Sequence, residues 1–151
     1  MDIGFGDVIT PAPQELAFPA LIDTVPQAEI KAYSLETVVA EKFHAMIVLS
    51  LANSRMKDFF DVYHILVTGR VDSEILSDAI TSTFANRETG YRKDHPLFTE
   101  EFFASKDRQS FWNAFLRKIK YPESIDFQTV GLLIREWLQP YWESLRDDSI
   151  L

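Results

Sequence analysis

The chain has 151 residues, of which 46% are hydrophobic and 13% aromatic, and it contains no cysteine. This composition suits one domain with a buried core and excludes a disordered chain, disulfide bonds and thiolate metal sites. The net charge of −8 disfavours nonspecific binding of nucleic acid but leaves room for one basic cleft. No stretch reaches the roughly 18 apolar residues of a membrane span, and no signal pattern opens the sequence, so we expect a cytoplasmic protein outside the membrane.

The first 33 residues predict strands rather than helices. Residues 2–9 have the pattern of a strand interrupted by Gly4 and Gly6, where a bulge or a close backbone approach is expected. A connector with four prolines follows and disfavours a long helix. Residues 29–33 alternate in polarity and predict a second short strand. We therefore assign residues 1–33 to a strand and proline-rich segment, and residues 34–151 to a helical domain.

From Ser34 onward the apolar residues follow a helical period. Ser34 is a plausible N-cap for the first helix, Asp72 or Ser73 for the third, and Gly69 ends the second. Pro140 is expected to bend or end the last helix. The helices are expected at about residues 35–51, 55–68, 73–84, 107–119 and 126–137, with a turn at 100–104 and a polar loop at 86–96. The fold class is therefore mainly α (α+β), with about five helices and a short N-terminal strand element.

One charged side chain interrupts the apolar face predicted for the first helix. At about 100° per residue, Lys42 falls in the middle of that face and His44 points away from it. On the second helix Arg55 lies within the apolar stripe, Asp58 lies on its border, and Asp61 lies farther round. The first face comprises Leu35, Val38, Val39, Met46 and Leu49, and the second comprises Phe59, Val62, Tyr63 and Leu66.

The short turn at residues 52–54 should make these two helices antiparallel neighbours. An unpaired ammonium between them is costly, so Lys42 extends to solvent, pairs with a carboxylate, or lines a cleft that binds an anion. Position along the hairpin favours Asp61 as its partner, whereas the facing of the helices favours Asp58, and both alternatives stay open. In a purely structural interpretation Lys42 pairs with Asp58, and Glu41 pairs with Arg55.

Two motifs stand in order on these two predicted helices. Residues 33–46 contain Ala-Glu-Lys at positions 40–42, and residues 54–63 contain Arg55, then Lys57-Asp58, then Asp61. Both stretches resemble the AbiEii/AbiGii toxin-type nucleotidyltransferase family, in which the same motifs follow one another with a short spacer. Residues 2–7 and 79–87 are also similar to the family. The resemblance covers most of the chain and weakens after about residue 120.

The resemblance implies a bacterial protein of the abortive-infection or toxin–antitoxin type that transfers a nucleotide from a nucleoside triphosphate to an acceptor, including RNA ends. By similarity Lys42 contacts the triphosphate and Asp58 positions the substrate or Lys42 itself, so both are candidate catalytic residues. Magnesium and the nucleoside triphosphate are implied as cofactors, and Asp2 is the candidate metal ligand. The candidate substrate-binding residues are Arg55, Glu41 and Asp61.

The Gly-Ser turn and the Asp-x-Asp pair, which in this family hold the triphosphate and the metal, are absent from the sequence. We therefore expect a truncated family member that contributes the Lys–Asp helical half of the site, is inactive alone, and binds neither metal nor nucleotide tightly by itself. Residues 1–33 would be the remnant of the nucleotidyltransferase sheet, whose open edge favours self-association or a partner chain. The alternative is a non-catalytic helical protein-interaction module.

The other residues considered as functional candidates are expected to have structural roles. His44, His64 and His95 lack the spacing of zinc ligands. The basic residues of the loop at 86–96 are expected in solvent rather than in a phosphate-binding patch. Six aromatic residues with helical spacing are expected in the second half of the core: Phe111, Trp112, Phe115, Trp137, Tyr141 and Trp142.

Overall fold

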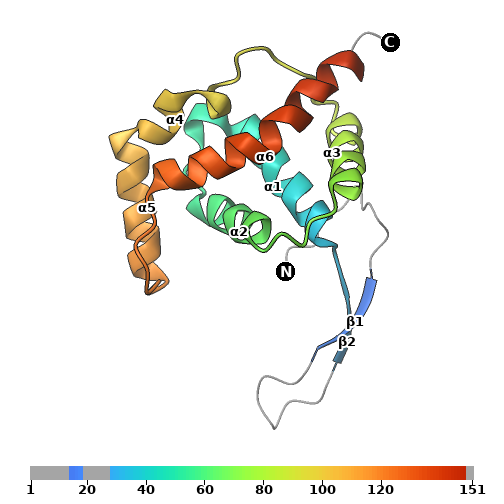
Figure 1. Ribbon diagram of the computed structural model, residues 1–151, viewed down its shortest axis with the longest axis horizontal. Helices are drawn as coiled ribbons and strands as arrows, with labels where there is room; N and C mark the ends of the chain where they lie inside the picture. Colours follow the sequence, from blue (N-terminus) through green and yellow to red (C-terminus); the bar gives the residue numbers. More distant parts are fainter. Residues whose placement is uncertain (1–13, 19–27, 149–151) are drawn as a thin grey trace.

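The computed structural model describes the backbone of residues 14–18 and 28–148 and the side chains of residues 33–146, and this part of the chain is mainly helical (Figure 1). A two-stranded hairpin precedes the helices. The elements in order are β1 (Gln14–Phe18), β2 (Ala28–Ala32), α1 (Leu35–Leu49), η1 (Ser50–Ala52), α2 (Met56–Val67), α3 (Ser73–Asn86), η2 (Pro96–Phe98), α4 (Glu100–Ala104), α5 (Lys106–Lys118) and α6 (Phe127–Asp148).

The strands β1 and β2 pair antiparallel, with Gln14 opposite Ala32 and Phe18 opposite Ala28. Figure 1 shows this hairpin standing away from the helices, next to the start of α1. Strand β2 falls where a strand was predicted for residues 29–33. The strand predicted for residues 2–9, and with it Asp2, lies outside the described residues.

The predicted helix boundaries near the caps are confirmed. The Ser34 hydroxyl accepts a hydrogen bond from the Thr37 amide at 3.2 Å and caps α1. The Asp72 carboxylate accepts from the amides of Glu74 and Ile75 and caps α3. Gly69 follows α2 with φ of +66°, the left-handed conformation that glycine adopts without strain.

The last helix differs from the prediction, because α6 continues through Pro140 to Asp148. Proline removes one backbone hydrogen bond there, but the residues on both sides of it are buried: Leu138 is fully buried and Trp142 is 2% exposed. The Trp142 indole also donates a hydrogen bond to the Arg92 carbonyl at 3.2 Å. Packing beyond the proline therefore outweighs the missing bond.

Aromatic rings fill much of the core. Trp112 and Trp142 are buried as predicted, and Phe115, Trp137 and Tyr141 are half-buried against the core. Phe111 is 52% exposed, so its predicted place in the core is wrong. At about 100° per residue it lies outside the stripe formed by the buried Trp112 and Leu116 of α5.

The buried face of α1 is also wider than predicted, because two helices, α2 and α3, pack against α1. Leu35, placed on the apolar face, is 40% exposed. His44, expected to point away, is 7% exposed, lies 2.8 Å from the Thr89 hydroxyl and packs edge-on against Phe84. The sequence prediction considered α2 as the only partner of α1, whereas α3 also covers the side of α1 that carries His44.

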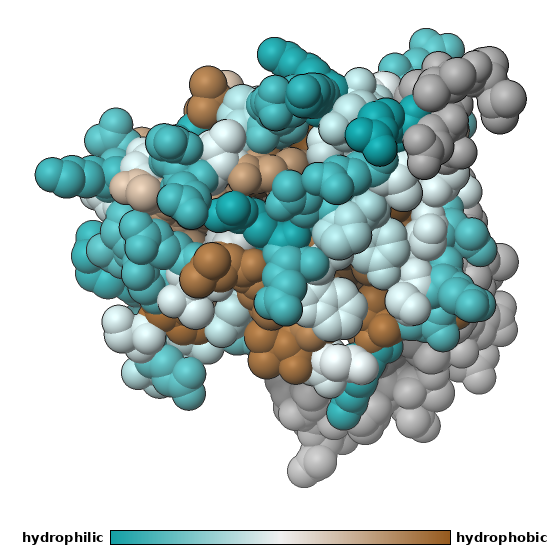
Figure 2. Space-filling model, turned by 45° about the horizontal axis from the view of Figure 1, so that its top comes forward, coloured by the Kyte–Doolittle hydropathy of each residue, from teal (hydrophilic) through white to brown (hydrophobic). Residues whose placement is uncertain are grey.

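Polar side chains dominate the face seen in Figure 2, where brown apolar patches are separated by teal residues. Exposed apolar side chains scattered in this way are ordinary on a folded protein. Within the described residues, none of the helices combines the length and the apolar content needed to cross a bilayer.

Gly131 of α6 provides a test of the packing. A Cβ added there would overlap the ring of Phe103, which is itself buried. We expect Gly131→Ala to lower the free energy of unfolding by about 2 kcal/mol, because overpacking outweighs the gain in helix propensity. Gly90 has open space around its Cα, so Gly90→Ala is the control and should change stability by less than about 0.5 kcal/mol. Urea unfolding of both variants tests this expectation, and equal unfolding midpoints for the two variants would contradict the packing argument.

Candidate functional site

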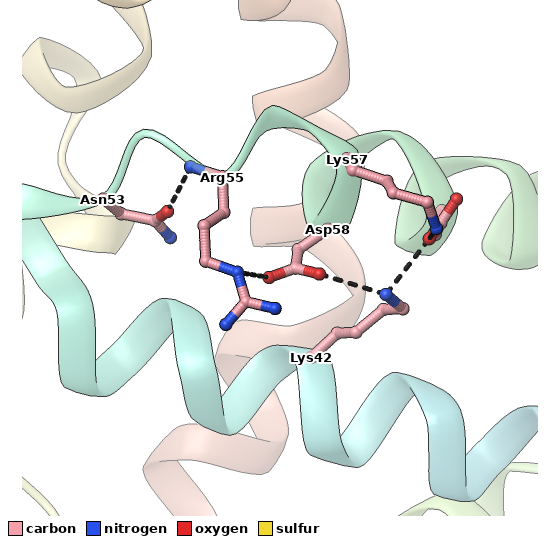
Figure 3. A network of polar contacts seen from close by, with 6 residues as sticks. Lys42, Asn53, Arg55, Lys57 and Asp58 are labelled. Atoms are coloured by element: carbon pink, nitrogen blue, oxygen red, sulfur yellow. Dashed lines mark hydrogen bonds and ion pairs between the residues drawn. The ribbon is translucent and has the colours of Figure 1, made fainter. Parts of the chain in front are cut away.

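The Lys42 ammonium on α1 contacts two carboxylates on α2 (Figure 3). Its Nζ lies 3.0 Å from Asp58 Oδ1, to which it donates a hydrogen bond, and 3.0 Å from Asp61 Oδ2. The sequence left Asp58 and Asp61 open as alternative partners, and the structure brings both to the same lysine. Lys42 is therefore paired twice across the seam between the two helices.

Lys42 lies at the border of the buried face of α1 rather than in its middle. Val39, Phe43 and Met46 are fully buried on that helix, whereas the Lys42 side chain is 22% exposed. The aliphatic part of a lysine can cover apolar surface while its ammonium stays near solvent. This position makes the charge less costly than the sequence suggested, because part of the Lys42 side chain stays at the surface.

Asp58 is the more buried of the two aspartates, with a side chain that is 4% exposed. Its Oδ2 lies 3.1 Å from Arg55 Nε, an ion pair that does not form a hydrogen bond. Asp58 lies in the first turn of α2, where the helix macrodipole favours a negative charge. Figure 3 shows Asp58 between the Arg55 and Lys42 side chains.

A short turn brings these residues together. The Asn53 side chain is 3% exposed, and its Oδ1 accepts a hydrogen bond from the Arg55 amide at 2.8 Å. This contact fixes the chain between η1 and α2, so that α2 returns along α1 (Figure 3). The Arg55 side chain is 58% exposed, so its predicted place within an apolar stripe is wrong. Arg55 is the N-cap residue of α2, and Figure 3 shows its side chain extending toward α1.

Lys57 joins the site, although the sequence analysis named it only as part of the second motif and gave it no role. Its Nζ lies 2.7 Å from Asp61 Oδ2, and its side chain is 73% exposed. The sequence signal is the spacing of four residues between Lys57 and Asp61, which places both on one helix face. We call Lys42, Arg55, Lys57, Asp58 and Asp61 the Lys42 cluster.

The Lys42 cluster holds three cations and two carboxylates, so its formal charge is +1 in a chain whose net charge is −8. Burial alone would lower the pKa of Lys42, but hydrogen bonds to Asp58 and Asp61 and the charges of both carboxylates together raise it above 10.5. The ammonium is therefore fully charged at neutral pH. A charged lysine can bind an anionic oxygen but cannot act as a base there.

Glu41 lies next to Lys42 in the sequence, but its ion pair with Arg87 at 2.6 Å points toward the end of α3. The structure pairs Arg55 with Asp58, in place of the Glu41–Arg55 pair of the structural interpretation. Glu41 and Arg87 thus tie α1 to α3, on the side of α1 away from the seam.

The described residues do not fit a magnesium site. Between residues 33 and 146 no group of three or more His, Asp or Glu side chains is close enough to share a metal ion. The oxygens of Asp58 and Asp61 face ammonium and guanidinium groups, which would repel a divalent cation. Asp2, the candidate metal ligand, lies outside the described residues.

His95 has a structural place. It is 4% exposed, and its Nε2 lies 3.0 Å from the Ile47 carbonyl while its Nδ1 accepts from the Leu97 amide at 3.2 Å. A carbonyl only accepts and an amide only donates, so the neutral ring carries its proton on Nε2. Burial lowers the pKa of His95 below 6.5, because its effect is larger than that of the hydrogen bond to Ile47, which raises the pKa.

The comparisons with known proteins place the chain in a family. Residues 1–136 match the family model described as nucleotidyl transferase AbiEii toxin, Type IV TA system. Because the match covers most of the chain, the protein belongs to this family of nucleotidyltransferase-type toxins of toxin–antitoxin systems. No curated protein and no solved structure matches the chain.

The two aspartates differ in burial, and this predicts unequal effects on stability. Asp58→Asn should lower the free energy of unfolding by about 2 kcal/mol, because Lys42 and Arg55 lose a buried counter-charge. Asp61→Asn should cost less than about 1 kcal/mol, because its pairs are partly exposed. Chemical denaturation of the two variants tests this, and equal losses would show that burial does not separate their roles.

The lowered pKa of His95 predicts a pH dependence. The unfolded chain takes up the His95 proton at about pH 6.5 and the folded chain only at lower pH. The contribution of the neutral ring is therefore complete above pH 6.5 and is lost as the pH falls through that value toward the folded pKa. The midpoint of urea unfolding should fall between pH 7 and pH 5, and less steeply in His95→Gln. Parallel profiles for both proteins would assign the dependence to other groups.

Proposed function

We propose that the Lys42 cluster is the triphosphate-contacting half of a nucleotidyltransferase site. The observation that carries the proposal is a fully charged lysine at the border of the core, next to an accessible seam with an excess of positive charge. Lysine binds phosphate oxygens as a compact point charge. Membership of the toxin family supports the reaction class, which is nucleotidyl transfer. The nucleoside triphosphate as donor and an acceptor such as RNA are part of the proposal.

In this proposal Lys42 contacts the phosphates and Asp58 positions Lys42. Asp58 is buried and contacts both Lys42 and Arg55, so it sets the direction of the ammonium before a ligand arrives. Such preorganisation lowers the cost of binding and of transition-state stabilisation, since the charge need not reorient. Arg55 is exposed and contacts the other oxygen of Asp58, so in this proposal it is available to a second phosphate group.

We further propose that the 151-residue polypeptide does not transfer nucleotides by itself. Its sequence contains no Gly-Ser turn and no Asp-x-Asp pair, and the described residues do not fit a magnesium site. Magnesium, when bound in a complete site, would neutralise charge on the phosphates. The residues of the Lys42 cluster bind and orient the triphosphate, and they carry out no proton transfer.

Nucleotide binding tests the role of Lys42. Titration calorimetry with GTP and ATP in the presence of magnesium should show weak binding, reduced about tenfold in Lys42→Ala, which corresponds to about 1.4 kcal/mol. Lys42→Arg should retain part of the affinity. Lys118→Ala is the matched control, because Lys118 is exposed in the last turn of α5 and its loss removes the same charge.

Equal affinity in Lys42→Ala and Lys118→Ala would contradict the proposed site. It would instead favour the alternative of a helical protein-interaction module in which the ion pairs of α1 and α2 are structural. A separate assay with labelled nucleoside triphosphate, magnesium and RNA should show no incorporation by the 151-residue chain. Robust incorporation would overturn the proposal that it is inactive alone.

A further inference from the structure

A single carboxylate oxygen of Asp61 lies between two ammonium groups. Asp61 Oδ2 is 3.0 Å from Lys42 Nζ and 2.7 Å from Lys57 Nζ. The two lysines come from different helices, Lys42 from α1 and Lys57 from α2. Two lysine ammonium groups that can hold one carboxylate oxygen can also hold one phosphate oxygen.

Asp61 is held there weakly compared with Asp58. The Asp61 side chain is 25% exposed and Lys57 is 73% exposed, whereas Asp58 is 4% exposed. An exposed ion pair contributes little to stability, because water and salt screen it and both side chains lose freedom. A ligand can therefore take the place of the Asp61 carboxylate without unfolding the seam, while Asp58 keeps hold of Lys42.

We propose that Lys42 and Lys57 form a two-lysine phosphate subsite and that Asp61 occupies it when no ligand is bound. The inference rests on the proposed function and deepens it by adding Lys57 as a ligand-binding residue and Asp61 as an internal competitor. The ligand class is a polyphosphate, such as the triphosphate of a nucleotide. On binding, a phosphate oxygen replaces Asp61 Oδ2 between the two ammonium groups, and the Asp61 side chain turns to solvent.

The proposal explains why a site for an anion contains so much negative charge. Three cations with no counter-charge would repel one another across the seam. Asp58 offsets part of this repulsion from a buried position and Asp61 offsets another part from a partly exposed one, which leaves a formal charge of +1. Only the exposed carboxylate can leave, so the two aspartates have different roles: Asp58 positions Lys42, and Asp61 competes with the ligand.

Binding of inorganic tripolyphosphate tests this without requiring catalysis. Titration calorimetry at low ionic strength should show that Asp61→Asn binds tripolyphosphate about five- to tenfold more tightly than the unaltered chain, because the internal competitor is removed. Lys57→Ala should bind it about fivefold more weakly. Asp78→Asn and Lys118→Ala are the charge-matched controls, since both residues are exposed on other helices.

The outcomes separate this inference from the proposed function. If Lys42→Ala weakens binding while Asp61→Asn and Lys57→Ala behave like their controls, the Lys42 site stands and the two-lysine subsite is wrong. If Lys42→Ala behaves like Lys118→Ala, the proposed function fails together with the subsite. Tighter binding in Asp61→Asn that is matched by Asp78→Asn would assign the gain to net charge alone and overturn the role of Asp61. Thermal unfolding of each variant confirms that it is folded before titration.

Discussion

The contact on which the site depends is the Lys42 ammonium held between a buried and a partly exposed aspartate. Desolvation opposes the charged form of a lysine at such a position, and only nearby negative charge restores it. The two carboxylates of α2 more than offset this cost. The raised pKa of Lys42 is therefore a consequence of the packing of α1 against α2, and the geometry of that packing fixes the position of its ammonium.

That geometry originates in a few residues between the helices. η1 ends at Ala52, and the buried Asn53 side chain then accepts the Arg55 amide, so α2 begins at a fixed point opposite α1. Asp58 follows within the first turn of α2 and Asp61 one turn later, and both reach Lys42. A one-residue shift in the start of α2 would rotate each aspartate by about 100° around the helix and separate it from the lysine.

Sequence patterns predicted the helices and their caps well, because Ser34, Asp72 and Gly69 act through local hydrogen bonds and backbone conformation. The same patterns failed where tertiary packing determines the burial of a side chain or the end of a helix. The burial of His44 depends on α3, and the continuation of α6 past Pro140 depends on the contacts of Trp142. Neither contact leaves a periodic signal within its own helix.

The candidate site was predicted only in part, because its details also depend on tertiary packing. The pairing of Lys42 with α2 follows from a charge on a hairpin seam, so the sequence indicated it. That one lysine contacts both Asp58 and Asp61 depends on the rotation of α2, which a helical wheel does not fix. Lys57 was named in the motif but given no role, because an exposed lysine four residues before an aspartate is common on helices. Its significance appears only when the oxygen that it contacts is also the one that Lys42 contacts.

The sign of the local charge also matters more here than the net charge. A chain with 23 acidic and 15 basic residues repels a triphosphate at long range. At physiological ionic strength, however, charges farther than about 8 Å are largely screened, so a bound phosphate responds mainly to the side chains that touch it. The Lys42 cluster has three cations and two carboxylates, and two of its cations share one carboxylate oxygen. The proposed anion site therefore depends on the local excess of one positive charge in this cluster, in a chain whose net charge is −8.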